Sequence, residues 1–442
     1  MPDSRTPAAL GYSMPAEWET HEATWLGWPH NPTDWPDKLD TIRWVYGEMV
    51  RKIAPGETVR MLVASRGEEK MARRYLARGG ADVSRVEFVV HATNRGWMRD
   101  SGPIFVRRAT GNRLETAIVH FHFNAWAKYP DWRKDRRVPE TAAQLLGRKL
   151  FDAQVNGREL VLEGGGIDVN GRGTLVTTEE CYLDQEMQVR NPGMGRAEFE
   201  SGLRDWLGVT NILWLPGGVA GDDTHGHVDD ICRFVNARTM VLIRESNPAD
   251  TNYQALEENW ERAADFRLED GSKPEVVALP MPAPLTFDGE RLPASYANFY
   301  IANAAVIVPT FNDANDRVAL GILSELFRDR PVVGIHAVDL VLGFGTLHCL
   351  SQQQPADSGS SAGRRNAGLI PSTRSLALLR VPSERTKTER SPWAGSIVTS
   401  ERPASQAVCP SSNRTRASAS GVEATSTAVA ATVLTPTVLP RI

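Results

Sequence analysis

The sequence is poor in cysteine and has no long apolar run. Its 442 residues include four cysteines, and none of them has C-x-x-C spacing, so neither a disulfide framework nor a structural zinc cluster is indicated. No window approaches the roughly 18 uninterrupted apolar residues of a membrane span, and the first residues lack the apolar core of an export signal. We therefore expect a cytoplasmic protein that does not act in a membrane.

Excess charge of either sign is also missing. The formal net charge is −4, so no global field favours a nucleic acid or an anionic membrane surface as partner. With 41% hydrophobic and 24% charged residues, the composition is typical of a folded globular protein. A small molecule is the partner that we expect.

The chain changes character near residue 355. Eleven of the 12 tryptophans precede residue 350, whereas Ser, Ala, Gly and Arg dominate afterwards. Segments of that kind bury too little apolar area to offset the entropy of ordering the backbone. We predict a globular domain over residues 10–355 and a low-complexity, disordered tail over residues 356–442.

Apolar runs alternate with helical patterns along the predicted domain. The expected helices are residues 38–53, 68–78, 139–150, 197–207, 252–266 and 313–327. The expected strands are residues 59–63, 86–90, 103–106, 117–123, 160–162, 174–177, 212–215, 231–242, 276–279, 300–308 and 331–334. This alternation indicates an α/β protein of about five helix-and-strand modules after an N-terminal helix.

Glycine and ionisable residues occur together in four stretches between these elements. They are GWMRDSGP (residues 96–103), LEGGGIDV (162–169), DDTHGHVDD (222–230) and GFGTLHCLSQQ (343–353). Loops on a rigid scaffold commonly carry binding and catalytic groups. The candidate functional residues are therefore sought there.

Cys349 is the candidate nucleophile. It follows Gly343 and Gly345, whose flexibility lets a side chain project toward a ligand. The alternative is a buried cysteine that packs as a small apolar residue. We prefer that alternative for Cys181 and Cys232, because their neighbours are apolar.

His227 and Asp229 alternate just before the predicted strand at residue 231, so a period of two would direct both side chains to one side. A histidine beside a carboxylate can act as a general acid and base. The alternative is a loop histidine capped by a nearby acid. His225 has the same parity, and periodicity does not choose between the two histidines.

Asp100 and Glu163 are the remaining acidic candidates. A single acid in such a loop is commonly a turn or capping residue. Carboxylates beside a thiol raise the thiol pKa and oppose ionisation, so an arrangement of Asp100, Glu163 and Asp229 around Cys349 requires a cation to offset their charge. A planar guanidinium is the best candidate substrate, because two carboxylates can each bind it through two hydrogen bonds.

Five motifs in this order resemble a known family. They are WPHNPTDWP (residues 28–36), WMRDSGP (97–103), LEGGG (162–166), GHVDD (226–230) and LHCLSQQQP (347–355). Together they resemble agmatine deiminase and the related Porphyromonas-type peptidyl-arginine deiminases. The resemblance implies the pentein fold, an α/β propeller of five ββαβ modules in pseudo-fivefold symmetry.

The resemblance also implies roles for residues in the motifs. Cys349 would be the nucleophile and His227 the general acid and base. Asp100 and Asp229 would bind the guanidinium, and Glu163 would place the histidine and the substrate. Trp97 would flank the guanidinium plane. Phe344 and Thr346 interrupt the run of glycines expected before the cysteine, and the tail after residue 355 is foreign to the family.

The expected reaction is the hydrolysis of agmatine to N-carbamoylputrescine and ammonia through an amidino-cysteine intermediate, without a metal or organic cofactor. Three alternatives stay open: deimination of peptidyl-arginine or free arginine, a binuclear metal hydrolase that uses HGHVDD as its ligand set, and a binder that keeps the ring without catalysis. A homodimer also stays open.

Overall fold

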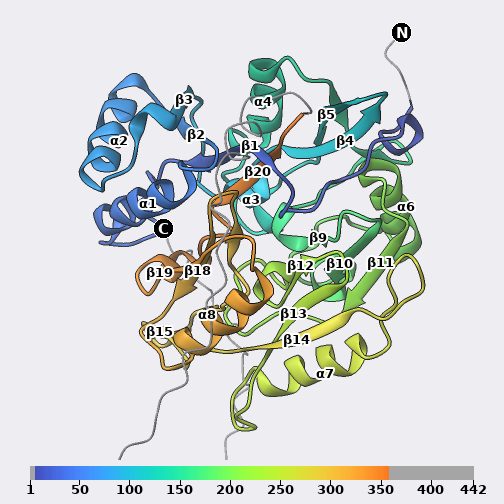
Figure 1. Ribbon diagram of the computed structural model, residues 1–442. Coiled ribbons are helices and arrows are strands. Elements are labelled where there is room, and N and C mark those ends of the chain that lie inside the picture. Colours follow the sequence, from blue (N-terminus) through green and yellow to red (C-terminus); the bar gives the residue numbers. More distant parts are fainter. Residues whose placement is uncertain (1–4, 358–442) are drawn as a thin grey trace, which may run out of the picture. The chain divides into compact units, whose positions relative to one another are not determined.

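The structure is a computed structural model that describes residues 5–357, and five sheets of three or four strands occur in this part of the chain. The predicted tail lies outside the described residues except for Ala356 and Asp357, and Trp393 and Cys409 lie outside them too. Figure 1 shows the arrangement of the described elements.

The first sheet joins the two ends of the described chain. Its strand order is β20 (Ser351–Pro355), β1 (His21–Gly27), β2 (Thr58–Val63) and β3 (Val86–Val90). The parallel crossovers run through α1 (Leu39–Ile53) and α2 (Arg66–Arg78). β20 pairs with β1 in the antiparallel sense, so the segment that follows Cys349 lies beside the N-terminal strand (Figure 1).

The other four sheets repeat one pattern, in which an antiparallel pair is followed by a helix and a parallel strand. The second sheet comprises β4 (Ile104–Thr110), β5 (Arg113–His120) and β6 (Leu150–Asp152), with the helix α4 (Val138–Leu146) before β6. The third sheet comprises β9 (Asp168–Val169), β10 (Thr174–Thr178) and β11 (Asn211–Leu215), with the helices α5 (Glu179–Leu183) and α6 (Arg196–Leu207) before β11. The fourth and fifth are β12 (Cys232–Asn236), β13 (Thr239–Arg244), α7 (Tyr253–Ala263) and β14 (Glu275–Pro280), then β17 (Tyr300–Ile301), β18 (Val306–Thr310), α8 (Asn315–Leu326) and β19 (Val332–His336).

Shorter elements connect these sheets. They are the helix α3 (Met98–Ser101) and the hairpins β7 (Gln154–Val155) with β8 (Arg158–Glu159) and β15 (Thr286–Phe287) with β16 (Glu290–Arg291). Because parallel strands are covered on both faces, their sequences are apolar runs rather than alternating ones. β13 illustrates this with five buried residues in succession. Within the described residues no helix combines the length and apolarity that crossing a membrane needs.

Several expected boundaries are wrong. The helix predicted for residues 139–150 ends at Leu146, because Gly147 takes a left-handed φ of 61° and Leu150 already starts β6. The run predicted as one strand over residues 231–242 is a pair, β12 and β13, joined by a turn. The run at residues 300–308 likewise divides into β17 and β18.

The sequence did not predict β1 and β20. In β20 the polar run Gln352–Gln354 is buried, contrary to the usual pattern of a strand. Two of its three amides are hydrogen-bonded: Trp25 Nε1 donates to Gln354 Oε1 at 3.0 Å, and Arg99 NH1 donates to Gln353 Oε1 at 2.7 Å. Gln352 Oε1 is buried without a hydrogen-bond partner in residues 5–357. Long-range partners thus help to stabilise the buried polar strand.

Candidate active site

Cys349 lies on the loop between the 3-10 turn Leu340–Gly343 and β20. Its side chain is 5% exposed and lines a pocket together with Trp97, Asp100, Trp126 and Phe344. These residues come from three segments, near residues 97–100, 126 and 344–349, that are distant from one another in the sequence. The pocket therefore forms only when the chain has folded.

Two neighbours shape the loop that carries the thiol. A Cβ on Gly345 would lie 3.0 Å from both the Cβ of Cys349 and the ring of Trp97, so the position has no room for a side chain. Phe344, where a glycine was expected, has a φ of 64° in the left-handed region. The interruption of the glycine run thus leaves the left-handed turn intact, at the cost of local strain.

Asn298 fixes the loop from the other side and was not predicted as a site residue. Its Oδ1 accepts a hydrogen bond from Thr346 Oγ1 at 2.7 Å and one from the backbone N–H of His348 at 3.1 Å. Its Nδ2 donates to Cys349 Sγ at 3.0 Å and to Asp230 Oδ1 at 3.0 Å. Asn298 follows an apolar stretch with no charged neighbour, so local sequence gave no signal for it.

Asp229 is the carboxylate in direct contact with the thiol. Its Oδ2 lies 3.7 Å from Cys349 Sγ and 2.6 Å from His348 Nδ1. Its Oδ1 is buried without a hydrogen-bond partner in residues 5–357. Burial alone would raise the pKa of Asp229, but the hydrogen bond and charge of His348, with the charges of His227 and Arg233, lower it below the usual value.

Asp100 is held by neutral donors instead. It lies on α3, where Oδ2 accepts from Trp126 Nε1 at 3.0 Å and Oδ1 accepts from the backbone N–H of Gly165 at 3.1 Å. Burial raises the pKa of Asp100 to about 6; His227 opposes the rise, whereas Asp229 and Glu163 add to it.

Trp126, which sequence reasoning missed, is presented by an unusual backbone. Ala125, Trp126 and Ala127 have φ values of 52°, 58° and 53°, all in the left-handed region that non-glycine residues avoid. The indole of Trp126 thereby reaches Asp100 and lines the pocket. Such strain persists only where the surrounding structure holds it, and it is common at functional sites.

His227 and Glu163 lie behind Asp100. His227 Nδ1 is 3.8 Å from Asp100 Oδ1, and His227 Nε2 is 3.5 Å from Glu163 Oε2. Neither ring nitrogen has a hydrogen-bond partner among the described residues. Burial would lower the pKa of His227, but Asp100, Cys181 and Glu163 raise it well above the usual value.

Glu163 is anchored by Arg190, whose Nε donates to Glu163 Oε1 at 3.2 Å. Burial would raise the pKa of Glu163, but Arg190 and His227 lower it below the usual value. Cys181 was expected to be a plain core residue. It is buried, yet its sulfur also lies within 4.8 Å of ligand atoms of Glu163 and His227.

The reasoning from strand periodicity is wrong in its geometry. Val228–Asp230 form a 3-10 turn, so His227 and Asp229 do not alternate along an extended lead-in. His225 Nε2 lies 2.8 Å from Asp184 Oδ2, away from the carboxylates beside His227. The turn places the two histidines in different surroundings, which parity could not distinguish.

The EGGG motif has no room for side chains. A Cβ on Gly165 would lie 2.6 Å from His227 Nδ1 and 2.8 Å from Asp100 Oδ1. On Gly164 it would lie 2.3 Å from the carbonyl oxygen of Arg99. The glycines therefore let one backbone segment lie directly against both the histidine and the carboxylate.

The surroundings of Cys349 oppose the ionisation of its thiol. Burial raises the pKa of Cys349 well above its ordinary value, and Asp229, Asp230 and Asp100 raise it further; the hydrogen bond from Asn298 acts in the opposite direction. At neutral pH the free site thus holds a protonated thiol beside buried acidic groups. A cation that enters the pocket would offset those charges and favour the thiolate.

Trp97 and the charged residues Asp34, Arg95 and Asp223 also line the pocket. Trp97 packs against Trp35 with ring centroids 5.1 Å apart. Arg95 forms an ion pair with Asp34. Lys128 Nζ lies 2.5 Å from Asp223 Oδ1. Both basic side chains are therefore already paired with acids.

Two residue groups in residues 5–357 have the composition and spacing to hold a metal ion. They are Glu163, Cys181 and His227, and Asp229, Asp230 and Cys349; the ligand atoms within each group lie within 4.8 Å of one another. Neither group contains His225 together with His227, as the H-x-H-x-D hypothesis required.

The family comparison covers most of the chain. The Porphyromonas-type peptidyl-arginine deiminase family matches residues 13–355. Agmatine deiminases from Pseudomonas fluorescens and Pseudomonas aeruginosa are each 35% identical in an alignment 374 residues long that covers 79% of this chain and 97% of each relative. The chain belongs to the Porphyromonas-type peptidyl-arginine deiminase family.

Solved structures show the same likeness. Agmatine deiminase of Enterococcus faecalis superposes with a TM-score of 0.73 at 30% identity, over 80% of this chain and 98% of that one. A variant agmatine deiminase of C. jejuni with bound substrate gives 0.68 at 28% identity, over 78% and 96% of the respective chains. These likenesses establish the α/β fold of the described chain as that of the agmatine deiminases.

Proposed function

We propose that this protein is a hydrolase acting on the C–N bond of a linear amidine and that its substrate is agmatine. Agmatine and water would give N-carbamoylputrescine and ammonia, a step toward putrescine. The observation that carries the proposal is a thiol whose ionisation buried carboxylates oppose. Such a site favours a cationic substrate, and the curated relatives named agmatine deiminase support this choice.

In this proposal Cys349 is the nucleophile, and Asp100 and Asp229 bind the guanidinium. The unpartnered Oδ1 of Asp229 is a ready acceptor for a guanidinium N–H. Trp97 lines the pocket beside the thiol and flanks the guanidinium plane. The substrate charge offsets the carboxylates and stabilises the ionising thiol as the guanidinium carbon becomes tetrahedral.

The reaction then proceeds in two steps. The sulfur of Cys349 bonds to the guanidinium carbon, a C–N bond breaks, and the nitrogen leaves as ammonia with the proton given up by the thiol, transferred through His227. An S-alkylthiouronium cation remains on the enzyme. Water, which loses a proton to His227, adds to the same carbon; the C–S bond breaks, the remaining proton of that water passes to the Cys349 sulfur, and the ureido product leaves. Glu163 orients His227.

The pocket supports agmatine over arginine. Free arginine carries a carboxylate that needs an unpaired cation, but Arg95 and Lys128 are each paired with an acid. Deimination of peptidyl-arginine or arginine is the alternative that a substrate comparison tests.

We also propose a pentein architecture, with the catalytic domain spanning residues 10–355. Support comes from five sheets that share an antiparallel pair and a parallel crossover, which fits ββαβ modules in a five-bladed propeller. The tail, the homodimer, the cytoplasmic location, and the absence of nucleic-acid binding and of a cofactor remain predictions.

The test is an assay of ureido product and ammonia with agmatine, arginine and an arginyl peptide as substrates. We expect turnover of agmatine to exceed that of the others by at least about a hundredfold in kcat/KM. Cys349→Ala should lower kcat by several orders of magnitude, because a nucleophile is lost, while agmatine still binds in calorimetry.

Equal turnover of the arginyl peptide would move the assignment to that alternative. Near-normal ammonia release by Cys349→Ala would contradict a cysteine nucleophile. EDTA separates the proposal from a metal hydrolase, since inactivation that Zn²⁺ or Mn²⁺ reverses would support the latter.

A further inference from the structure

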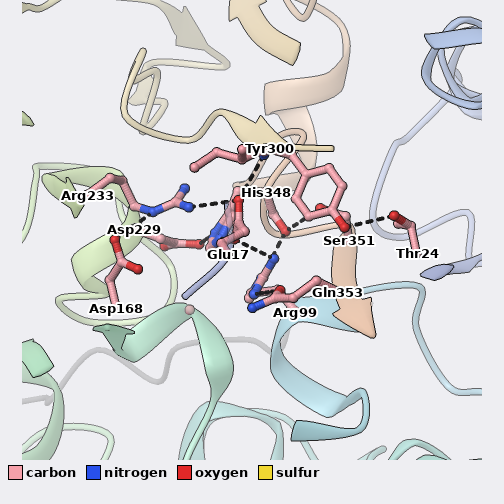
Figure 2. A network of polar contacts seen from close by, with 12 residues as sticks. Glu17, Thr24, Arg99, Asp168, Asp229, Arg233, Tyr300, His348, Ser351 and Gln353 are labelled. Atoms are coloured by element: carbon pink, nitrogen blue, oxygen red, sulfur yellow. Dashed lines mark hydrogen bonds and ion pairs between the residues drawn. The ribbon is translucent and has the colours of Figure 1, made fainter. Parts of the chain in front are cut away.

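His348, the residue next to the thiol, bridges two acids that are far apart in the sequence. Its Nδ1 lies 2.6 Å from Asp229 Oδ2, and its Nε2 lies 2.8 Å from Glu17 Oε2. All three side chains are buried. Figure 2 shows the imidazole between them, with Arg99 and Arg233 also directed at Glu17.

Both ring nitrogens of His348 lie within hydrogen-bond distance of a carboxylate oxygen. Ionised carboxylates only accept hydrogen bonds, so a ring that satisfies both of them carries a proton on each nitrogen. Arg99 and Arg233 both lie beside Glu17, and Arg233 also lies beside Asp168.

Glu17 anchors the far side of the ring. Its Oε1 accepts from the backbone N–H of Ile301 at 2.8 Å and lies 3.0 Å from Arg233 NH2. Its Oε2 accepts from Arg99 NH2 at 3.2 Å as well as from His348. With these donors the carboxylate cannot rotate without breaking several charge-assisted hydrogen bonds.

The consequence for Asp229 is geometric. One oxygen, Oδ2, is held by the imidazolium, whereas the other, Oδ1, is buried with no partner in the described part of the chain. The carboxylate is therefore fixed in rotation and keeps one unsatisfied acceptor. The pKa of Asp229 and that of Glu17 are both lowered despite burial, which agrees with two ionised groups.

We propose that His348, supported by Glu17, is a positioning residue that keeps Asp229 oriented, with its free oxygen available to a cationic ligand beside Cys349. This inference rests on the proposed function in taking that ligand to be a guanidinium. His348 itself touches neither the substrate nor the reacting carbon, so it acts through Asp229.

Two substitutions of His348 each remove one of its two hydrogen bonds and keep the other. The amide of His348→Asn can donate near the Nδ1 position and so keep the link to Asp229, whereas the amide of His348→Gln reaches the Nε2 position and keeps the link to Glu17. Both variants lose the imidazolium charge and have similar polarity. They differ in whether Asp229 or Glu17 keeps its hydrogen bond to residue 348.

The experiment compares alkylation of Cys349 by chloroacetamidine, a cation, and iodoacetamide, which is neutral, in the full-length protein. The ratio of the two rates measures how well the carboxylates select a cation and cancels changes in general thiol reactivity. We expect His348→Gln to lower this ratio by about ten- to a hundredfold and to raise KM for agmatine more than it lowers kcat. His348→Asn should keep the ratio of alkylation rates and the KM for agmatine within about fivefold of the wild-type values.

A ratio that falls equally in both variants, or in neither, would overturn the positioning role. Glu17→Gln provides a second measure should a substitution at residue 348 prevent folding, and it should lower the ratio about three- to tenfold. An unchanged ratio in folded Glu17→Gln would contradict its supporting part. Failure of the proposed function is distinguishable, because wild-type protein would then form no ureido product even if its alkylation ratio behaved as expected.

Discussion

Two buried carboxylates near Cys349 are held by opposite kinds of partner. Asp229 is bound by the ring of His348 within a buried network of charges, and its pKa is lowered. Asp100 is bound by an indole N–H and a backbone N–H, both neutral, and its pKa is raised to about 6. Both side chains are equally inaccessible to water.

The difference teaches how a buried acidic site stays stable without its ligand. If both acids were ionised and unpaired, the desolvation cost would be several kcal/mol for each. Here Asp229 is compensated by the protein, whereas Asp100 retains part of its cost until a cation arrives. Binding of a guanidinium would then complete the ionisation of Asp100 and of Cys349 together.

The largest effects are expected when each acid is neutralised in turn, which tests whether Asp229 and Asp100 differ as described. Asp229→Asn removes the proposed guanidinium ligand and one of the two acids that hold the buried ring of His348, so we expect kcat/KM to fall at least a thousandfold and the free energy of unfolding to fall by about 3–5 kcal/mol. Steady-state kinetics and urea denaturation measure the two effects.

Asp100→Asn is the matched variant. It should also lower kcat/KM, but its free energy of unfolding at pH 7.5 should be unchanged or higher. The folded-state pKa near 6 exceeds the ordinary value of 3.8 for an aspartate, so ionising Asp100 above pH 6 costs on the order of 2–3 kcal/mol that the amide avoids. Equal destabilisation by the two substitutions would contradict the asymmetry.

A steric change tests the side of the pocket that holds Asp100. A methyl group on Gly165 would overlap His227 and Asp100, so we expect Gly165→Ala to lower kcat/KM by about ten- to a hundredfold. Gly321→Ala is the control, because nothing lies within 4 Å of its added Cβ on α8. Wild-type kinetics in a folded Gly165→Ala protein would show that the contact is not needed.

The smallest effect concerns pH. With a pKa near 6, Asp100 is protonated in acid and then loses the negative charge that attracts a guanidinium, so kcat/KM should halve near pH 6 and fall about tenfold per unit below it. The lowered pKa of Asp229 adds no inflection in this range. A rate profile from pH 5 to 8 with agmatine measures it, and a flat profile down to pH 5 would be inconsistent with the raised pKa.

The sequence predicted candidate site residues in glycine-rich motifs, and the structure brings Cys349, Asp100 and Trp97 to one pocket and Asp229 into contact with Cys349. Their local chemistry was visible in the sequence. The predicted local structure was wrong, because Asp229 lies in a 3-10 turn and not at the start of a strand.

The residues that the sequence did not predict lie far from Cys349 along the chain. Asn298 and Glu17 reach the cysteine loop from 51 and 331 residues away, and only folding brings them there. Trp126 depends on a left-handed backbone turn that no glycine announces. Strand β20 is polar in sequence and buried in the fold. Patterns of local periodicity contain no information on such pairings.

The most direct test of the account is the ionisation of Cys349 in the free protein, measured as the thiolate absorbance near 240 nm in wild type minus Cys349→Ser. The account predicts a midpoint above about 9, because burial and acidic neighbours oppose the thiolate until a cation binds. A midpoint at or below about pH 7 would contradict it, since the thiol would then be activated without the substrate.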